Sequence, residues 1–206
     1  MTVKQTRFTP KDLEKINNSV LSRYAKVAGG AWAKLFRYPT GRQGMEGLGY
    51  DKTLTDSLLD SVASTYCGVT HVFSTDPVSQ GDRILDIGCG AGVDTILADR
   101  LAGPDGSSTG VDMTQEMVAL AAANAKKSGA ANVSFSCASA ESLPFPDHSF
   151  DTVISNGVFN LVPDKQKALG EAWRVLRPGG RLAIADQVLS DESPRDVDTM
   201  TRHWGR

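Results

Sequence analysis

The segment ILDIGCGAG, at residues 84–92, combines residue types that can hold a small ligand. Its apolar run leads directly into three alternating glycines, Gly88, Gly90 and Gly92. Glycines at the carboxyl end of a strand let the backbone approach a ligand closely. Val93 stands where a dinucleotide fingerprint needs a further glycine, and the Asp86 carboxylate would repel a pyrophosphate. The segment therefore favours a ligand with a cationic amino-acid group over a dinucleotide.

A second acidic position, Asp112, ends the next apolar segment, 20 residues beyond Gly92. A carboxylate at this point can accept hydrogen bonds from both hydroxyls of a ribose. The alternative is that Asp112 caps the helix that follows, a position that aspartate favours. Thr114 can serve as that cap, so we predict the ribose role for Asp112. Met113 would then cover an adenine face or pack in the core.

These residues belong to a pattern of short apolar strands that alternate with helices. We predict strands over residues 83–87, 108–111, 133–136, 152–155 and 181–185. We predict helices over residues 93–101, 114–128 and 164–176, and a turn at Pro178-Gly179-Gly180. The connection between the third and fourth strands is rich in loop residues. This order predicts an α/β fold with a doubly wound, mostly parallel sheet.

The N-terminal part is predicted to form a helical cap next to this sheet. Thr9 and Pro10 suit the N-cap and first position of a helix, and apolar residues then recur at helical spacing, which indicates packing surface. Residues 38–50 hold four glycines and a proline, which favours a loop, and a helix follows over about residues 55–66. The predicted domains are a cap and substrate-side segment, residues 1–80, and a ligand-binding domain, residues 81–206.

Composition excludes several classes of protein. The 206 residues, 40% of them hydrophobic, suit one globular domain with an appendage. A formal net charge of −2 argues against a nucleic-acid partner, because phosphate binding needs a basic surface. No apolar run reaches the roughly 18 residues of a membrane span. Three widely spaced cysteines form no disulfide framework, so we expect a cytoplasmic protein. The three histidines match no metal-ligand spacing, so we expect no metal site, and the lack of a long apolar run predicts no membrane partner.

Taken in order, the motifs resemble those of the class I S-adenosylmethionine-dependent methyltransferases over about residues 82–188. Besides the glycine-rich turn and Asp112, the resemblance rests on residues 138–151 (ASAESLPFPDHSFD) and 176–182 (LRPGGRL). It implies a Rossmann-like core, S-adenosylmethionine as cofactor and methyl transfer to a small molecule by in-line displacement. The cofactor-binding residues that it implies are Asp86, Gly88, Cys89, Gly90, Gly92, Asp112, Met113, Ser139, Ala140, Glu141, Ser155 and Asn156.

A narrower resemblance links the chain to arsenite methyltransferases and their relatives. It is carried by residues 153–165 (VISNGVFNLVPDK), with support from residues 66–68, 110–114 and 203–205. Trivalent arsenic needs two or three converging thiolates. The arsenite enzymes carry one cysteine where this chain has Gly157 and another after the Trp-Gly pair, so only Cys67 matches a thiol position. We therefore predict a relative without the metalloid site, and keep an arsenite or metalloid methyltransferase as the alternative.

We expect the acceptor site where the N-terminal part folds over the carboxyl ends of the strands, because ligands of open α/β sheets bind there. The residues predicted to position the acceptor are Tyr38, Tyr50 and Asn156, with Cys67, Phe159 and Asn160 as further lining. A tyrosine face can stabilise a sulfonium by cation–π attraction, or both tyrosines can simply hold their loop on the core. Two further alternatives keep the cofactor: intramolecular displacement on its aminobutyrate chain, which releases methylthioadenosine, and a cofactor-binding interaction module without turnover.

The end of the chain raises a question about the sheet. The class I fold normally continues past the fifth strand with a helix and two further strands, whereas only about 20 residues follow Ala185. We expect these C-terminal strands to be absent. An open sheet edge invites pairing with another chain, so we predict a homodimer.

Overall fold

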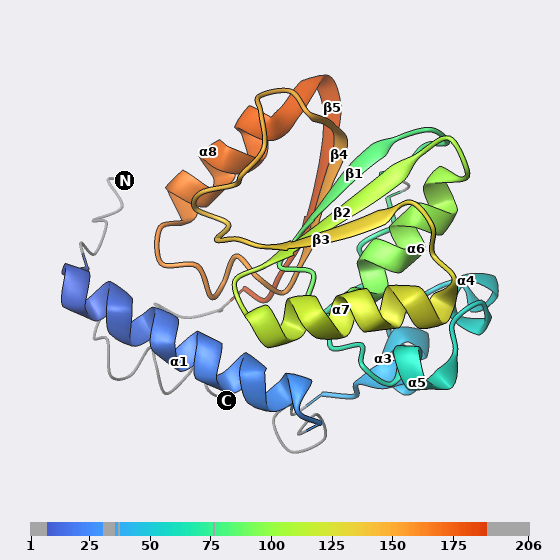
Figure 1. The fold of residues 1–206 in the computed structure, drawn as a ribbon, viewed down its shortest axis with the longest axis horizontal. Helices are drawn as coiled ribbons and strands as arrows, with labels where there is room; N and C mark the ends of the chain where they lie inside the picture. The colour runs from blue at the N-terminus through green and yellow to red at the C-terminus, as the bar shows by residue number, and fades with distance from the viewer. Residues whose placement is uncertain (1–7, 31–35, 37, 76, 189–206) are drawn as a thin grey trace.

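The computed structural model of the chain describes residues 8–30, 36, 38–75 and 77–188. Its centre is a five-stranded sheet in which every pairing is parallel. The strands are β1 (Arg83–Ile87), β2 (Ser107–Asp112), β3 (Val133–Cys137), β4 (Phe150–Asn156) and β5 (Leu176–Ala185). Their order across the sheet is β3-β2-β1-β4-β5 (Figure 1).

Three helices connect these strands and cover both faces of the sheet. α6 (Val93–Ala102) and α7 (Gln115–Ser128) lie on one face, and α8 (Lys165–Val175) lies on the other (Figure 1). β1 and β4 are buried along almost their whole length, as expected for central strands covered on both sides. The predicted doubly wound, parallel α/β fold is confirmed.

The direction of winding reverses at β1. The chain passes from β1 to β2 and β3 on one side of the sheet, and then crosses to β4 and β5 on the other side. The connections that leave β1 and β4 therefore diverge at their carboxyl ends. In open α/β sheets this point of reversal is where ligands bind.

The last strand begins earlier than the sequence predicts. β5 already includes Pro178-Gly179-Gly180, which we predicted as a turn, and its pairing with β4 shifts register between Phe150 and Thr152. Gly180 permits this, because a Cβ there would lie 2.8 Å from the Asp151 carbonyl oxygen. The residues that predicted a turn, Pro178-Gly179-Gly180, therefore form an irregularity within β5.

The N-terminal part is helical, but its helices differ from the prediction. α1 (Pro10–Ala28) begins as predicted, with a capping box between Thr9 and Asp12. Residues 38–50 contain a helix, α3 (Gly41–Gly47), where we predicted a loop. The helix predicted over residues 55–66 is instead two short helices, α4 (Lys52–Asp56) and α5 (Asp60–Ala63).

Arg42 explains how these short helices hold together. Its guanidinium donates to the carbonyl oxygens of Thr55 and Leu58, at 2.8 and 2.9 Å, and pairs with Asp60 at 2.8 Å. These contacts satisfy carbonyl groups that the breaks between the helices leave without helical partners. The glycine content of residues 38–50 predicted a loop. The Arg42 contacts join residues that are far apart in the chain, so local sequence could not predict them.

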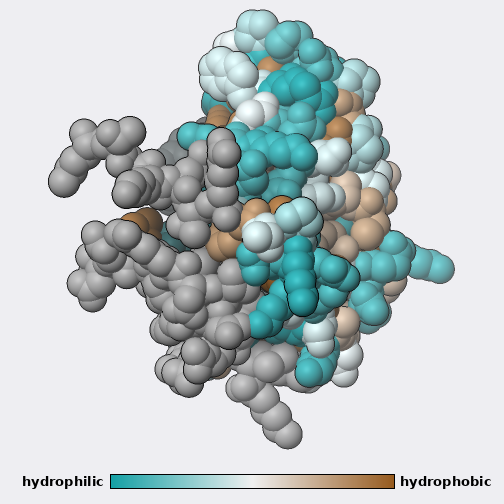
Figure 2. Space-filling model, turned by 90° about the vertical axis from the view of Figure 1, so that its left-hand side faces the viewer, coloured by the Kyte–Doolittle hydropathy of each residue, from teal (hydrophilic) through white to brown (hydrophobic). Residues whose placement is uncertain are grey.

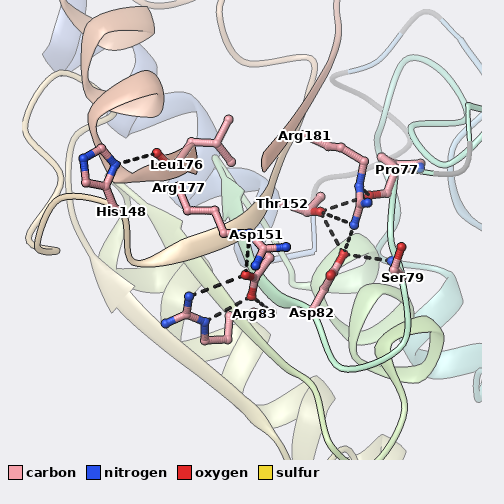
Figure 3. Close-up of polar contacts among 10 residues, drawn as sticks. All are labelled: Pro77, Ser79, Asp82, Arg83, His148, Asp151, Thr152, Leu176, Arg177 and Arg181. Carbon is pink, nitrogen blue, oxygen red and sulfur yellow. Dashed lines mark hydrogen bonds and ion pairs between the residues drawn. The ribbon is translucent and has the colours of Figure 1, made fainter. Parts of the chain in front are cut away.

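Two acidic clusters hold the amino ends of the central strands together (Figure 3). Asp82 accepts hydrogen bonds from the Thr152 hydroxyl at 3.0 Å and the Ser79 amide at 2.8 Å, and pairs with Arg181. Asp151 pairs with Arg83 at 3.0 Å and with Arg177 at 2.9 Å. Each buried carboxylate at this end of the sheet thus has an arginine counter-charge.

One face of the molecule is drawn by its hydropathy in Figure 2. The face drawn in Figure 2 carries hydrophilic residues over much of its described part, with smaller apolar areas between them. Within residues 8–30, 36, 38–75 and 77–188, no helix is long and apolar enough to cross a membrane. The predicted absence of C-terminal strands concerns residues beyond 188, outside the described part, and the domain boundary near residue 80 stays a prediction.

Candidate active site

One cavity opens where the carboxyl ends of β1, β2 and β4 meet, at the point of reversal. It encloses about 1090 Å³ of empty space, counted out to its mouth. Its floor is the turn after β1, and its walls come from the ends of β2 and β4, from residues 138–141 and from α1. This is the position of a small-molecule site in an α/β fold.

The glycine-rich turn supplies a backbone cradle. The Gly90 amide donates to the Asp112 carboxylate at 3.0 Å, which joins the turn to the end of β2. Gly90 has a φ of +52°, and a Cβ at this position would meet nothing within 4 Å. Because Gly90 lines the cavity, that open space belongs to the site, and any larger side chain would project into it.

Asp112 lies at the cavity edge, as its predicted role requires. Its second carboxylate oxygen accepts the Thr114 amide at 2.8 Å, while Thr114 occupies the N-cap position of α7 without a side-chain cap bond. Burial raises the Asp112 pKa, although the two backbone hydrogen bonds oppose this shift. A carboxylate has about four lone-pair positions, so acceptors remain for a ligand's hydroxyls.

The segment after β3 forms the wall beyond Asp112. Ser139, Ala140 and Glu141 all line the cavity, next to Met113. The Ser139 hydroxyl oxygen accepts the Glu141 amide at 3.2 Å, and the Glu141 carboxylate accepts the Asp164 amide at 2.8 Å. Glu141 thereby holds this wall against the start of α8.

Asp86 lies beneath the turn with a neutral partner. Its carboxylate accepts the Thr95 hydroxyl at 2.6 Å, and only 2% of the residue is exposed. Burial, together with the neighbouring Asp94 carboxylate, raises the Asp86 pKa to about 8. At neutral pH the protonated form of Asp86 is therefore favoured.

A buried polar cluster lies on the β4 side of the cavity. The Tyr50 hydroxyl and the Asn156 side-chain amide donate to the two Asp94 carboxylate oxygens, at 2.7 and 2.9 Å. Asn156 also accepts the Val69 amide at 2.9 Å and donates to the Thr70 carbonyl at 2.9 Å. This cluster ties the cap to β4 and α6.

Neutral groups from the cap face the cavity. The Tyr38 hydroxyl donates to the Cys67 carbonyl oxygen at 3.0 Å, and both residues line the cavity. Burial raises the Cys67 pKa to about 12, so its side chain is a thiol at neutral pH. Burial likewise raises the Tyr38 pKa.

The cavity gathers most of the sequence-predicted residues. Those that line it are Tyr38, Asp86, Gly88, Cys89, Gly90, Asp112, Met113, Ser139, Ala140, Glu141 and Asn156. Three lie outside the lining: Gly92 packs against α7, Tyr50 lies behind Asp94, and the Ser155 hydroxyl donates to the Ile87 carbonyl at 2.9 Å. Of the predicted acceptor lining, Cys67 is present, whereas Phe159 and Asn160 lie outside.

Sequence reasoning missed several contributions to the cavity, among them helix α1 and Asp94. Asn17, Val20 and Tyr24 of α1 line one wall, although the apolar spacing of α1 predicted packing surface alone. Asp94 was also missed. Its only local signal was a carboxyl group in the first turn of a helix, where the helix dipole already explains it.

Comparison with known proteins identifies the family. A model of the methyltransferase domain matches residues 78–205 of this chain. The chain belongs to the class I S-adenosylmethionine-dependent methyltransferases. The predicted family and the predicted Rossmann-like methyltransferase fold are both confirmed.

Three of the proteins that this chain is similar to are described here by name. An arsenite methyltransferase from Halobacterium salinarum is 37% identical, covering 94% of this chain and 52% of its own length. A demethylmenaquinone methyltransferase from Listeria welshimeri is 38% identical over 53% of this chain and 46% of its own length. A crystal structure of an arsenic(III) methyltransferase from Chlamydomonas reinhardtii is 33% identical, with a TM-score of 0.53 over 73% of this chain and 50% of that one. The chain thus spans about half the length of these proteins.

Proposed function

We propose that this methyltransferase binds S-adenosylmethionine in the cavity and catalyses methyl transfer to a small molecule. The observation that carries the proposal is that three carboxyl groups, those of Asp86, Asp94 and Asp112, line one cavity together with Gly90 and the open space beside it. Such a site suits a ligand that combines ribose hydroxyls with positive charge.

The residues present fit this cofactor. The open space that a Cβ at Gly90 would fill is a cradle for a closely approaching ligand. Asp112 would accept the ribose hydroxyls, Met113 with residues 139–141 would enclose the adenine, and Asp86 with Gly88 would surround the methionine part. When bound, S-adenosylmethionine supplies a methyl group on a positively charged sulfur that is already a good leaving group.

The contribution of the chain is to orient the reactants and exclude water. Val158, Leu161 and Val162 offer apolar wall next to the turn, and Val20 and Tyr24 of α1 close the opposite side. Asn156 and Tyr50 use their polar groups to fix Asp94 and residues 69–70. We therefore assign them positioning roles, and Tyr38 is the candidate for contact with the acceptor.

The similarity to arsenite methyltransferases favours a metalloid as the second candidate acceptor. The thiol chemistry of the cavity opposes it. Cys67 and Cys89 line the cavity, but burial raises the pKa of both, and arsenic needs thiolates. Gly157, where the resembled enzymes carry a cysteine, has a φ of +74°, which L side chains rarely adopt. We therefore propose an acceptor other than arsenite.

The proposal is tested by following the cofactor's methyl group. The protein is incubated with S-adenosylmethionine labelled in the methyl group and a fractionated pool of small molecules. We expect S-adenosylhomocysteine and a labelled small molecule, both absent without protein. Methylthioadenosine in place of S-adenosylhomocysteine would show intramolecular displacement, and cofactor binding without either product would show an interaction module. Either result overturns the proposal.

Arsenite with excess thiol is run in parallel, with Cys67→Ser as the matched variant. We expect no methylated arsenic from either protein. Methylated arsenic from the wild type that disappears in Cys67→Ser would make the metalloid the acceptor.

Two further predictions concern the whole protein. Among the described strands, β5 pairs only with β4, so the homodimer predicted from an open edge is tested by light scattering, where a monomer would reject it. The cytoplasmic location is tested by fractionating cells that express the chain.

A further inference from the structure

Asp94 is a carboxyl group of the cavity that the expected cofactor contacts leave without a role. It lies in the first turn of α6, lines the cavity and is 7% exposed. Tyr50 from the cap and Asn156 from β4 each donate to one of its oxygens, so it is fixed from two sides. Each oxygen keeps a lone pair for a further contact.

Asp94 and Asp112 lie on opposite sides of β1 at the carboxyl edge of the sheet. Asp112 ends β2 on one side of β1, whereas Asp94 is bonded to Asn156 at the end of β4, on the other side. A ligand whose ribose hydroxyls are at Asp112 and that extends over the β1 turn reaches toward Asp94. In S-adenosylmethionine the group that follows the ribose is the positively charged sulfur.

Asp94 forms no ion pair within the described part of the chain. No ion pair of the described residues involves Asp86 or Asp112 either. Burial raises the Asp94 pKa to about 6, with the Tyr50 and Asn156 hydrogen bonds opposing the shift. Asp94 is thus ionised at neutral pH, while its neighbour Asp86, with a pKa raised to about 8, is protonated.

We infer that Asp94 is a specificity-determining residue, whose carboxylate gives the cavity a preference for the sulfonium of S-adenosylmethionine over the neutral thioether of S-adenosylhomocysteine. The inference rests on the proposed function, because it requires that the cavity binds these two molecules. Attraction between opposite charges is strong in a buried, poorly solvated cleft. Methyl transfer removes the positive charge from sulfur, so the product loses the attraction that held the substrate.

The experiment compares dissociation constants for the two ligands by calorimetry, without turnover. Asp94→Asn removes the charge and keeps the shape. We expect S-adenosylmethionine binding to weaken by about tenfold or more, and S-adenosylhomocysteine binding by less than about threefold. Asp99→Asn makes the same change on the same helix, outside the cavity lining, and should alter neither constant. Tyr50→Phe removes one of the two hydrogen bonds that favour the ionised Asp94 carboxyl, so it should lower the preference for S-adenosylmethionine by less than Asp94→Asn does.

The outcomes separate this inference from the proposed function. Equal weakening of both ligands, or no weakening of either, in a folded Asp94→Asn protein overturns the role of Asp94. Failure of the wild type to bind either ligand overturns the proposed function instead. Thermal unfolding of each variant shows whether it is folded.

If Asp94→Asn does not fold, the inference is tested on the wild-type protein. The preference for S-adenosylmethionine should fall as the pH is lowered from 8 to 5, because Asp94 takes up a proton, and a constant ratio overturns the inference. The other titratable groups that face Asp94 are Asp86, Tyr50, Tyr66 and Cys67. The His71 ring lies 4.3 Å from that of Tyr50, so the profile is repeated in His71→Gln.

Discussion

The two ends of the parallel sheet treat their acidic side chains in opposite ways. At the amino ends, Asp82 and Asp151 pair with arginines (Figure 3). At the carboxyl ends, Asp86 and Asp94 have only neutral hydrogen-bond partners among the described residues. The first arrangement compensates charge within the chain and holds strands together. The second leaves the carboxyl groups of the cavity without a cationic partner among the described residues, as the proposed binding of a cationic cofactor requires.

The pKa values follow this contrast. Hydrogen bonds and ion pairs with Arg83 and Arg177 overcome burial and lower the Asp151 pKa, so this group stabilises the fold above its unfolded pKa and loses that effect as the pH falls. Burial raises the Asp86 pKa from 3.8 to about 8. A carboxyl whose pKa rises on folding favours the fold in its protonated form, so its contribution is lost as the pH rises from 3.8 toward 8.

The largest expected effect is on cofactor binding at the carboxyl end. Asp112→Ala should weaken S-adenosylhomocysteine binding by about 1.5–3 kcal/mol, the scale for losing hydrogen bonds to a charged group. Calorimetry measures the change, and Asp105→Ala, on an exposed turn, is the control. An unchanged dissociation constant would show that Asp112 only organises the Gly90 turn and the start of α7.

The next largest effect expected is a dependence of the free energy of unfolding on pH. Without ligand, lowering the pH from 8 to 5.5 should raise the free energy of unfolding, because Asp86 takes up a proton in the folded state. The expected contribution is on the order of 1–3 kcal/mol, and it should be absent from Asp86→Asn. Urea unfolding at several pH values measures it. Parallel curves for the two proteins would contradict the uncompensated burial of Asp86.

At the amino end we expect a change in stability without a change in binding. Asp151→Asn leaves Arg83 and Arg177 without their acid, and should lower the free energy of unfolding by about 1–2 kcal/mol, a modest figure because both arginines are about half exposed. The loss should shrink as the pH falls below 4, where the wild-type carboxyl also takes up a proton. Weaker S-adenosylhomocysteine binding in this variant would break the proposed separation of the two ends.

The smallest effect tests the neutral partner of Asp86. Thr95→Val removes the hydroxyl that donates to its carboxylate and should cost about 0.5–1.5 kcal/mol of stability. It should also move the pH-dependent change attributed to Asp86 to higher pH, because that hydrogen bond favours the ionised form. If the pH midpoint of this change does not shift, the Thr95 hydrogen bond does not stabilise the ionised form of Asp86.

The fold and one side of the site could be predicted, because the residues that indicate them lie close together in the sequence. Asp86, the glycine turn and Asp112 follow strands directly, and strand–helix alternation alone predicts where such positions meet. The β4 side was less visible: Asp94 and Asn156 are 62 residues apart, and Asp94 and Tyr50 are 44 apart. Helix α3 was missed for a similar reason, since Arg42 reaches carbonyl groups 13 and 16 residues away.

The central claim is that acidic groups at the carboxyl ends, and not those at the amino ends, bind the cofactor. The most direct measurement is a calorimetric titration of S-adenosylmethionine into the wild type, Asp112→Ala and Asp151→Asn at neutral pH. We predict saturable binding of one molecule per chain to the wild type, clear weakening in Asp112→Ala and no change in Asp151→Asn. No saturable binding to the wild type, or equal weakening in both variants, would contradict the account.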